Sequence, residues 1–173
     1  LVSYPSYDNN RISDSTYFAQ LNADQSLPLR NNATQTLKAP GSTFKPITAI
    51  AGLEEGAITL SDMINCTGIY EEVSNPIRCW KYPGFHGPLN VVGGIENSCN
   101  YFFYTVGSRL YENTDDQLYK TAALYGLTTK TGIDLPGEAA TIMHKKENMG
   151  LVELATVSFG QSFQITPVQL ITT

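Results

Sequence analysis

The sequence Ala39-Pro40-Gly41-Ser42-Thr43-Phe44-Lys45-Pro46 places a serine hydroxyl and a lysine amine three residues apart. At this spacing two side chains lie on one face of a helix, one turn apart. A serine hydroxyl becomes a good nucleophile when a neighbouring base takes its proton, and an uncharged amine can be that base. Ser42 and Lys45 are therefore our candidate nucleophile and base.

The local sequence predicts a helix that begins beside Ser42. Gly41 permits a tight turn, and Pro46 is tolerated in the first helical turn. Apolar residues at helical spacing predict a helix over residues 43–55, which Gly56 ends. A helix N-terminus favours negative charge, such as a developing oxyanion, and disfavours a protonated lysine. The alternative is a serine that only caps the helix, followed by a surface lysine.

The composition is that of one globular domain of ordinary size. The chain has 173 residues, of which 42% are apolar and 16% charged, which is enough to bury a sizeable core. The net charge is −5 and no long basic cluster occurs, so we expect no nucleic-acid partner. No run approaches the about eighteen apolar residues of a membrane span.

The cysteines and histidines do not form a familiar ligand pattern. An odd number of cysteines, Cys66, Cys79 and Cys99, argues against a full disulfide framework. Cys66 and Cys79 are close enough to bridge, and two unpaired buried thiols are the equal alternative. Because His86 and His144 are isolated and no Cys-x-x-Cys occurs, we expect no metal site and no cofactor.

The rest of the chain is predicted to be mostly helical, with long connections. Residues 1–5 predict the end of a strand, and residues 6–40 a polar, irregular segment that wraps the surface. Gly and Pro residues make residues 61–88 a loop-rich segment with short strands. Further helices are predicted over residues 89–96, 101–110, 114–125 and 151–159, with capping boxes at Thr114–Gln117 and Thr166–Gln169.

A second polar motif occurs in Glu96-Asn97-Ser98-Cys99-Asn100. Ser98 follows Ser42 by 56 residues and precedes Asn100 by two, on a short loop predicted between helices. From there both side chains can point into one cleft, where the serine can relay a proton and the asparagine can hold Lys45 and a substrate carbonyl. The alternative is a serine and an asparagine that only cap helices.

With these motifs in this order, the chain resembles the transpeptidase domain of class B penicillin-binding proteins. Pro40–Pro46 matches the family's Ser-x-x-Lys box at every position, and Asn97–Phe103 matches its Ser-x-Asn box and the following helix. Within the family, the sequence is most similar to the division or sporulation branch. Further matches follow in family order at Ser3–Asp8, Cys66–Gly68, Ile77–Trp80, His86–Gly87, Tyr125–Leu127, Thr131–Glu138, Phe159–Gln161 and Thr166–Leu170.

The resemblance implies a mainly α fold, the helical part of the penicillin-binding protein/serine β-lactamase-like transpeptidase fold, with little of the central sheet. Residues 1–173 are then a partial transpeptidase domain of a peptidoglycan D,D-transpeptidase. By the same resemblance, Ser42 attacks the carbonyl between two terminal D-alanines and Lys45 takes its proton. Ser98 is the implied proton relay, and Asn100 is implied to position the substrate and Lys45.

The resemblance also implies partners and a location. The ligands are peptidoglycan stem peptides and β-lactams, which mimic the D-Ala-D-Ala end and acylate Ser42. The whole protein is implied to be membrane-anchored by a segment outside this chain. It is implied to work with division or elongation machinery at the extracytoplasmic face of the bacterial membrane. Backbone N–H groups, one of them from Ser42, are the implied oxyanion hole.

The family's third motif, Lys-Thr-Gly on a strand beside the cleft, has a false match at Lys130–Gly132. We reject this match because it lies about thirty residues past Asn100 and precedes Phe159–Gln161, which in the family comes before the true motif. The true strand is expected beyond Thr173. Losing one oxyanion donor lowers rates roughly a hundredfold. We therefore expect this chain alone to acylate very slowly or not at all, and its uncovered helical side to self-associate.

Two other functions are compatible with the Ser-x-x-Lys pair. A serine β-lactamase shares the chemistry but needs a device for fast deacylation, such as a glutamate-activated water. No candidate for that device stands out near Ser98. A non-catalytic β-lactam-binding sensor module is the second alternative. The intact Ser42, Lys45, Ser98 and Asn100 argue against it.

Overall fold

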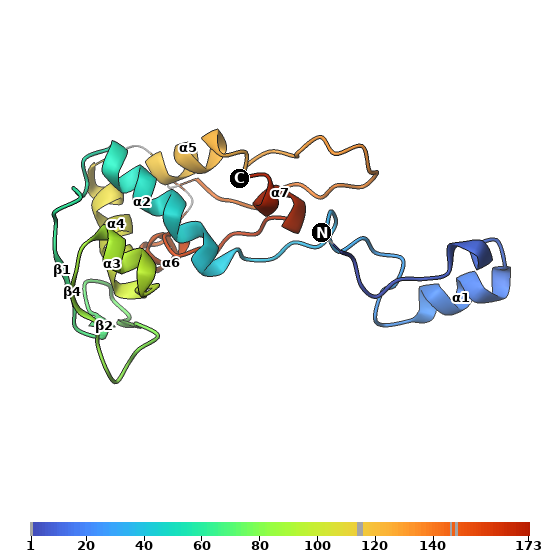
Figure 1. Ribbon diagram of the computed structural model, residues 1–173, viewed down its shortest axis with the longest axis horizontal. Helices are drawn as coiled ribbons and strands as arrows, with labels where there is room; N and C mark the ends of the chain where they lie inside the picture. The colour runs from blue at the N-terminus through green and yellow to red at the C-terminus, as the bar shows by residue number, and fades with distance from the viewer. Residues whose placement is uncertain (1, 114–115, 146, 148) are drawn as a thin grey trace.

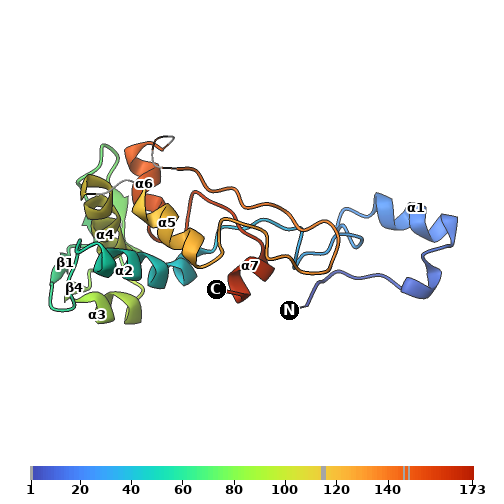
Figure 2. The ribbon, with the colours of Figure 1, turned by 90° about the horizontal axis from the view of Figure 1, so that it is seen from above.

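The structure is a computed structural model that describes residues 2–113, 116–145, 147 and 149–173. The chain is elongated, with a helical body at one end and a short N-terminal arm at the other (Figures 1 and 2). The helices of the body are α2 (Lys45–Glu54), α3 (Val91–Glu96), α4 (Asn100–Asn113), α5 (Gln117–Leu124) and α6 (Leu151–Val157). A short helix α7 (Pro167–Ile171) lies between the body and the arm (Figure 1).

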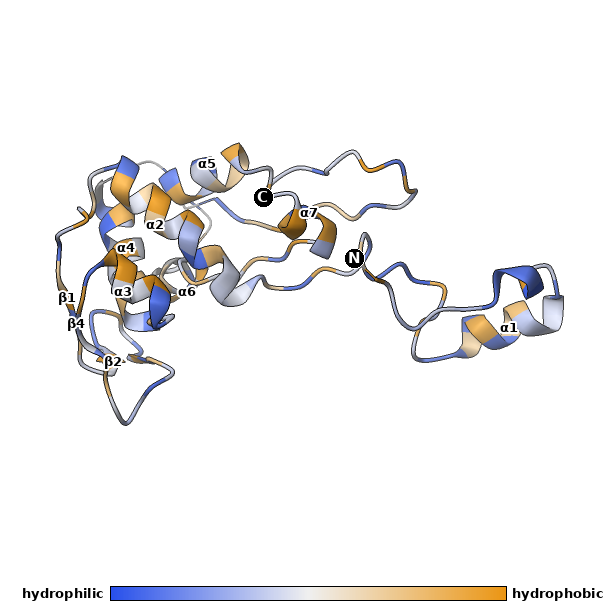
Figure 3. Cartoon of the chain, viewed as in Figure 1, coloured by the Kyte–Doolittle hydropathy of each residue, from blue (hydrophilic) through white to orange (hydrophobic). Residues whose placement is uncertain are grey.

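Helix α4 forms the centre of the helical body and packs against α2 and α6. Its residues Phe102, Phe103 and Val106 are almost completely buried. They join a core to which α2, the short strands and the loop after α2 also contribute. Figure 3 shows the hydrophobic residues of α2, α4 and α7 as orange segments of the ribbon. The burial of these side chains fixes the helices that carry both predicted motifs.

Four short strands form two separate antiparallel pairs in the described residues. Strand β1 (Ile64–Cys66) pairs with β4 (Gly87–Leu89), so that Cys66 lies opposite Gly87. Strand β2 (Ile69–Tyr70) pairs with β3 (Ile77–Arg78). The prediction of a mainly helical fold with little sheet is confirmed, and so is the loop-rich segment with short strands.

The predicted helix over residues 43–55 is confirmed with one refinement. A 3-10 turn η2 (Gly41–Phe44) leads directly into α2, so that Ser42 lies just ahead of the α-helix. Pro46 is in the first turn of α2, and Gly56 follows its end with a φ of +67°. The helix predicted from residue 89 begins at Val91 instead, because the Asn90 side chain accepts a hydrogen bond from the Gly93 amide and caps it.

Two predictions for the N-terminal region are wrong. No strand occurs in residues 2–5. The segment 6–40 contains η1 (Asn9–Arg11) and α1 (Ser15–Ala23), and it projects away from the helical body rather than wrapping it (Figure 2). Helix α1 begins where the Asp14 carboxylate accepts hydrogen bonds from the Thr16 and Tyr17 amides. An acidic N-cap before an apolar pattern is a signal that could have revealed it.

The two predicted capping boxes have different outcomes. The box at Thr166–Gln169 is confirmed: the Gln169 amide donates to the Thr166 hydroxyl over 3.2 Å, and the Thr166 amide donates to the Gln169 side chain over 2.9 Å. The box at Thr114–Gln117 lies in part outside the described residues, and α5 begins at Gln117. Across the described ranges, every helix is too short or too polar to cross a bilayer.

Candidate active site

Ser42 lies at the edge of a pocket where η2 meets the start of α4. Its side chain is exposed, whereas Phe44 and Lys45 directly after it are buried. The hydroxyl of Ser42 does not cap α2, whose N-terminus has no side-chain cap. The alternative of a purely capping serine is therefore wrong. The pocket is lined by Gly41, Ser42, Trp80, Ser98, Asn100, Phe159 and Gln161.

Lys45 connects the two predicted motifs. Its amine donates hydrogen bonds to the Ser98 carbonyl over 2.6 Å, to the Ser98 hydroxyl over 2.9 Å and to the Asn100 side-chain oxygen over 2.7 Å. The lysine is only 2% exposed, so it is not a surface lysine. The structure thus brings Ser42, Lys45, Ser98 and Asn100 together, as the sequence predicted, while their catalytic roles stay predictions.

The environment of Lys45 favours its neutral form. Burial lowers the pKa of the Lys45 amine from 10.5 to about 8, and the nearby Cys99 and Cys79 thiols oppose that shift. An amine with a pKa close to the working pH can accept a proton from a neighbouring hydroxyl and release it again. The geometry and the pKa of Lys45 together suit a general base.

The turn that carries Ser42 is held by a close contact between two glycines. The Gly41 amide donates a hydrogen bond to the Gly160 carbonyl over 2.8 Å. Gly41 has a φ of +62° and Gly160 a φ of +84°, both in the left-handed region that favours glycine. A Cβ atom on Gly160 would lie 2.7 Å from the carbonyl carbon and the amide nitrogen of Gly41. Phe159–Gln161 therefore reaches the pocket only because residue 160 has no side chain.

The loop before α4 is also held by Trp80, a pocket residue that lies outside the two predicted motifs. The Trp80 indole N–H donates to the Asn97 carbonyl over 3.2 Å and to the Ser98 carbonyl over 3.0 Å. Ser98 has a φ of +47°, which a residue other than glycine rarely adopts. The Ser98 carbonyl therefore accepts from Lys45 and from Trp80. A single tryptophan in a loop rich in Gly and Pro was the available signal for this residue.

A cluster of three cysteines and one histidine lies directly behind this loop. The Nδ1 atom of His86 is 3.5 Å from the sulfur of Cys66 and 3.6 Å from that of Cys79, and the Cys79 and Cys99 sulfurs are 3.9 Å apart. All four donor atoms lie within 4.8 Å of one another. The expectation that the chain has no set of metal ligands is therefore wrong, because folding brings together residues that are 13, 7 and 13 positions apart.

The donor set and its spacing fit a closed zinc-type site. Zn–S bonds of about 2.3 Å and Zn–N bonds of about 2.0–2.1 Å in a tetrahedron place sulfurs about 3.8 Å apart, and sulfur and nitrogen about 3.5 Å apart. The three distances within the cluster match these values within about 0.1 Å. Cys66, Cys79, His86 and Cys99 could hold such an ion with four protein ligands. A site of that kind is structural and leaves no position for a substrate.

Cys66 and Cys79 do not form a disulfide in the structure. All three cysteines are free and buried, so the alternative of unpaired thiols is correct. The Cys79 and Cys99 sulfurs are in hydrogen-bond contact over 3.9 Å, and either thiol can be the donor. This contact lowers the pKa of the Cys79 thiol, and the same contact, with burial, raises the pKa of the Cys99 thiol. One thiolate is therefore favoured within the pair.

The Lys130–Gly132 sequence lies on an irregular loop and not on a strand, which supports its rejection as the third motif. The buried carboxylate of Glu138 holds this loop, since it accepts hydrogen bonds from the Thr131 amide over 2.7 Å and from the Gly132 amide over 3.3 Å. The residues that line the pocket of Ser42, all of them described, include no lysine or arginine.

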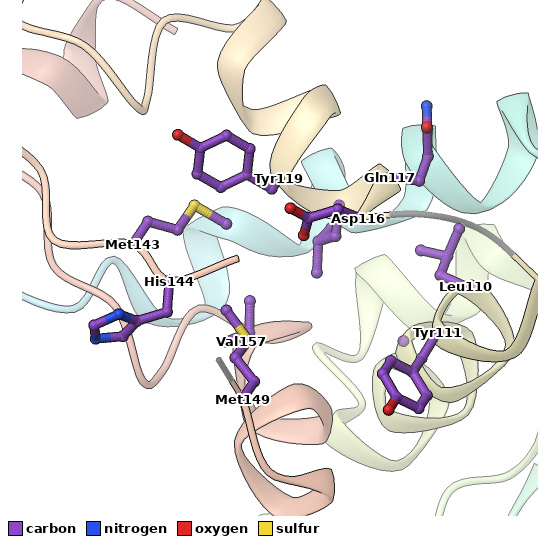
Figure 4. Close-up of a pocket in the computed structure, with 11 residues that line it drawn as sticks. Leu110, Tyr111, Asp116, Gln117, Tyr119, Met143, His144, Met149 and Val157 are labelled. Carbon is purple, nitrogen blue, oxygen red and sulfur yellow. The ribbon is translucent and has the colours of Figure 1, made fainter. Parts of the chain in front are cut away.

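A second cavity lies between α4, α5 and the segment before α6 (Figure 4). Figure 4 shows Met143 and Met149 facing Tyr119 and Leu110 across it. Its volume of about 30 Å³ has room for no more than a few water molecules. This cavity is therefore too small for a substrate, and the pocket of Ser42 remains the candidate active site.

Comparison with known protein families gives one match over the whole chain. The model of the penicillin binding protein transpeptidase domain matches residues 1–173. The chain is 40% identical over 147 residues to stage V sporulation protein D of Bacillus subtilis, covering 84% of the chain and 22% of that protein. It is 39% identical over 153 residues to the peptidoglycan D,D-transpeptidase MrdA of Escherichia coli, covering 85% of the chain and 23% of that protein.

Comparison with solved structures also gives a penicillin-binding protein. The structure superimposes with a TM-score of 0.87 on penicillin-binding protein PBP2 of Helicobacter pylori, solved in a complex with MreC. The two chains are 29% identical, and the match covers 98% of this chain and 33% of the PBP2 chain. The chain thus spans less than a quarter of the length of the curated relatives named above.

Proposed function

The chain belongs to the penicillin-binding protein transpeptidase family, and from this premise we propose that it forms the acylation site of a peptidoglycan D,D-transpeptidase. The observation that carries the proposal is the buried Lys45 amine, which donates to Ser98 and Asn100 from 2.6 to 2.9 Å, beside a pocket that Ser42 also lines. A serine nucleophile, a lysine base and a serine relay in one pocket suit acyl transfer. The relatives named peptidoglycan D,D-transpeptidase support the substrate class.

In the proposed reaction, the Ser42 oxygen attacks the carbonyl between the two terminal D-alanines of a stem peptide. The Ser42 proton passes to the neutral Lys45 amine, whose pKa of about 8 suits this exchange. The Ser98 hydroxyl, 2.9 Å from that amine, carries the proton on to the departing D-alanine nitrogen. The C–N bond of the substrate breaks, and an acyl ester on Ser42 remains.

The second half of the reaction resolves the ester. An amine from a neighbouring stem peptide attacks the acyl carbon and loses a proton to the same relay, and Ser42 leaves with a proton from Lys45. The Asn100 side chain, 2.7 Å from the Lys45 amine, positions that amine and the substrate amide. β-Lactams enter the same pathway, but their ring-opened acyl group stays attached and blocks the second amine.

Binding of the substrate carboxylate is expected to be weak in this pocket. No lysine or arginine is among the described side chains that line it, so a terminal carboxylate has no cation to pair with. We therefore propose that this chain acylates slowly while keeping Ser42 as the only acylated residue. The sensor-module alternative predicts an equally stable adduct, whereas the β-lactamase alternative predicts rapid hydrolysis and turnover of a chromogenic cephalosporin.

We also propose a setting for the whole protein. The H. pylori relative was solved in a complex with MreC. By analogy, this chain belongs to a protein that works with such elongation or division machinery at the extracytoplasmic face of the membrane. Peptidoglycan stem peptides and β-lactams are its proposed ligands.

Intact-mass spectrometry after prolonged incubation with benzylpenicillin tests the proposed function. We expect one added penicilloyl group per chain, mapped by peptide digestion to Ser42 and absent in Ser42→Ala. Ser61→Ala, in an exposed turn after α2, is the matched control and should acylate like the original chain. An adduct that maps elsewhere, or that persists in Ser42→Ala, would contradict the assignment of Ser42.

A further inference from the structure

The indole N–H of Trp80 points toward the backbone of the loop before α4, although most of the residue is exposed. Trp80 is the only tryptophan of the chain, it is 61% exposed, and it lines the pocket that contains Ser42. An indole N–H can only donate, and at an exposed position water can accept from it. Here it donates instead to two successive carbonyls, that of Asn97 over 3.2 Å and that of Ser98 over 3.0 Å. The indole therefore holds the backbone of this loop.

The loop that Trp80 holds has a backbone conformation that needs support. Ser98 has a φ of +47°, in the left-handed region that favours glycine. The Ser98 amide donates back to the Ile95 carbonyl of α3 over 2.9 Å. The carbonyls of Asn97 and Ser98 lie beyond the end of α3 and accept from Trp80. The strained turn is thus held by α3 through its amide and by Trp80 through its carbonyls.

The Ser98 carbonyl accepts from Trp80 and from Lys45 at the same time. The Lys45 amine donates to this carbonyl over 2.6 Å and to the Ser98 hydroxyl over 2.9 Å. A carbonyl oxygen has two lone pairs, so these two donors can both bind it. Because the carbonyl and the hydroxyl belong to one residue, a rotation of this backbone would also displace the hydroxyl from the amine. Trp80 and Lys45 together therefore fix the proposed proton relay.

The two donors behave differently during the proposed reaction. The Lys45 amine gains and loses a proton, so the number of N–H groups that it can donate changes between three and two. The indole N–H of Trp80 is a donor only and keeps its proton throughout. The contact with Trp80 can therefore keep the Ser98 carbonyl paired while a proton moves between Ser42 and Lys45.

A ring contact fixes the direction in which the Trp80 N–H points. The neighbouring ring comes from the Cys/His cluster, which is formed by Cys66, Cys79, His86 and Cys99. The His86 imidazole packs edge-on against the indole, with ring centroids 5.3 Å apart and an interplanar angle of 63°. Such edge-to-face packing of rings is directional. The exposed indole is thus held in the orientation that brings its N–H to the loop.

We infer that the indole N–H of Trp80 positions the proposed relay, by holding the Ser98 backbone so that the Ser98 hydroxyl stays at the Lys45 amine during acylation. Trp80 is a positioning residue and exchanges no proton with the substrate. Its effect on acylation rests on the proposed function, whereas the hydrogen bond can be tested without it. The competing role is that of an apolar wall, in which the ring contacts the ligand and the N–H does not affect the rate.

Replacing the indole by a ring without the N–H is the first test. Because Trp80 is the only tryptophan, a tryptophan auxotroph grown on β-(3-benzothienyl)alanine changes this position alone. In that residue a sulfur atom takes the place of the N–H in a ring of nearly the same shape. Acylation by benzylpenicillin is then followed by intact-mass spectrometry over a range of concentrations. This series separates the limiting rate constant from the half-saturating concentration.

The limiting rate constant of the benzothienyl protein should fall about tenfold to a hundredfold, since misplacing reacting groups by about 1 Å can cost about a hundredfold. Its half-saturating concentration should stay the same. Replacement by 5-fluorotryptophan keeps the N–H and is the matched control, which should acylate like the original chain. Trp80→Phe, which also lacks the donor, should behave like the benzothienyl protein. An unchanged limiting rate constant, with or without a higher half-saturating concentration, overturns the inference and leaves Trp80 at most the role of a wall.

A cycle with Ser98 tests whether Trp80 acts through the hydroxyl of that residue. In Ser98→Gly the hydroxyl is absent, so loss of the Trp80 N–H should slow acylation little further. Residues that act through one hydrogen-bond network are non-additive in this way. The same fold loss in the original chain and in Ser98→Gly would show that Trp80 acts independently of the relay, and it overturns the inference.

The last test needs no acylation. Labelling with ¹⁵N gives one indole N–H resonance, and its exchange with solvent should be slow for so exposed a side chain. Lys45→Met removes the second donor to the Ser98 carbonyl, so this resonance should move downfield. Lys120→Met, on the exposed side of α5, is the matched control and should leave it unchanged. Rapid exchange, or a resonance that does not respond to Lys45→Met, overturns the inference. If no form of the protein acylates, the proposed function is contradicted, and the resonance still decides whether Trp80 holds Ser98 at Lys45.

Discussion

The backbone of Gly160, which has no side chain, lies directly against the backbone of Gly41, the residue before the candidate nucleophile. The Gly41 amide donates to the Gly160 carbonyl over 2.8 Å, and both residues have positive φ angles. This contact joins the Phe159–Gln161 segment to the turn of Ser42, two parts of the chain that are more than a hundred residues apart. The position of Ser42 thus depends on a backbone contact with a distant segment, whose Phe159 and Gln161 also line the pocket.

Gly160→Ala should therefore lower both stability and acylation. The new Cβ atom would overlap the Gly41 backbone, and a φ of +84° is strained for alanine. We expect a loss of about 1–3 kcal/mol in the free energy of unfolding, measured by denaturant titration, and slower labelling of Ser42 by fluorescent penicillin. Gly126→Ala is the control: its φ is +76° but nothing lies near its Cβ position, so only the strain of about 1 kcal/mol should appear.

Lys45→Met should remove the proposed base while keeping a long side chain in the buried site. Acylation of Ser42 should fall by about 10²–10⁴-fold, the range for loss of a general acid or base. The rate is measured by fluorescent penicillin labelling on a denaturing gel. Lys120→Met, on the exposed side of α5, should acylate normally. Labelling of Lys45→Met at the original rate would show that another group takes the Ser42 proton.

The pH dependence of acylation should report on the same amine. Lys45 has a pKa of about 8, so it carries a proton below that pH and is neutral above it. The rate should rise about tenfold per pH unit well below 8 and level off above it. A flat profile from pH 6 to 9, measured on protein that stays folded throughout, would contradict Lys45 as the base.

The same pKa shift affects folding stability with a defined sign. The folded chain holds the Lys45 proton less tightly than the unfolded chain, whose lysine has a pKa near 10.5. The unfolded state therefore binds more protons between about pH 8 and 10.5, and this residue contributes stability that increases with pH across that window. Denaturant titrations of the original chain and of Lys45→Met should diverge in that range.

Two variants of Ser98 separate the role of its hydroxyl from the effect of its strained backbone conformation. Ser98→Ala and Ser98→Gly both remove the hydroxyl that accepts from Lys45, so both should lower acylation. Only the glycine variant tolerates the φ of +47°, so it should be the more stable of the two, by about 1 kcal/mol. Equal acylation by the original chain and both variants would exclude the Ser98 hydroxyl as a relay.

Gln169 should be important for stability rather than for acylation. Its buried side chain donates over 2.6 Å both to the Thr129 carbonyl and to the Thr141 hydroxyl, and it accepts from the Thr166 amide. Gln169→Leu leaves these partners unpaired and should cost about 1–3 kcal/mol in thermal or denaturant unfolding. Gln20→Leu, exposed in α1, is the matched change and should have little effect.

The sequence was sufficient to predict the helical body and the approach of Ser42, Lys45, Ser98 and Asn100. These residues lie in short motifs, next to helices that the local sequence signals predict. Both the family resemblance and the apolar periodicity therefore identify them. Helix α1 was missed because its apolar pattern is short and most of its residues stay exposed. The Asp14 cap was the one local signal available there.

The Cys/His cluster was missed for a different physical reason. Its members come from the end of β1, the segments on either side of the Trp80 loop, and the start of α4. Their separations along the chain have no regular pattern, and only the pairing of β1 with β4 and the packing of α4 bring them together. Trp80 and Gly160 were missed likewise, since their roles depend on contacts between distant segments.

The hydrogen bonds of Lys45 have one more consequence. A protonated amine has three N–H groups, and here three oxygens of Ser98 and Asn100 accept them. A neutral amine has only two N–H groups and a lone pair. When Lys45 loses its proton, one of these oxygens must therefore lose its donor. The Ser98 hydroxyl can then turn and donate to the lone pair of the neutral amine, so the acid–base step reverses one hydrogen bond between Lys45 and the loop that faces the substrate.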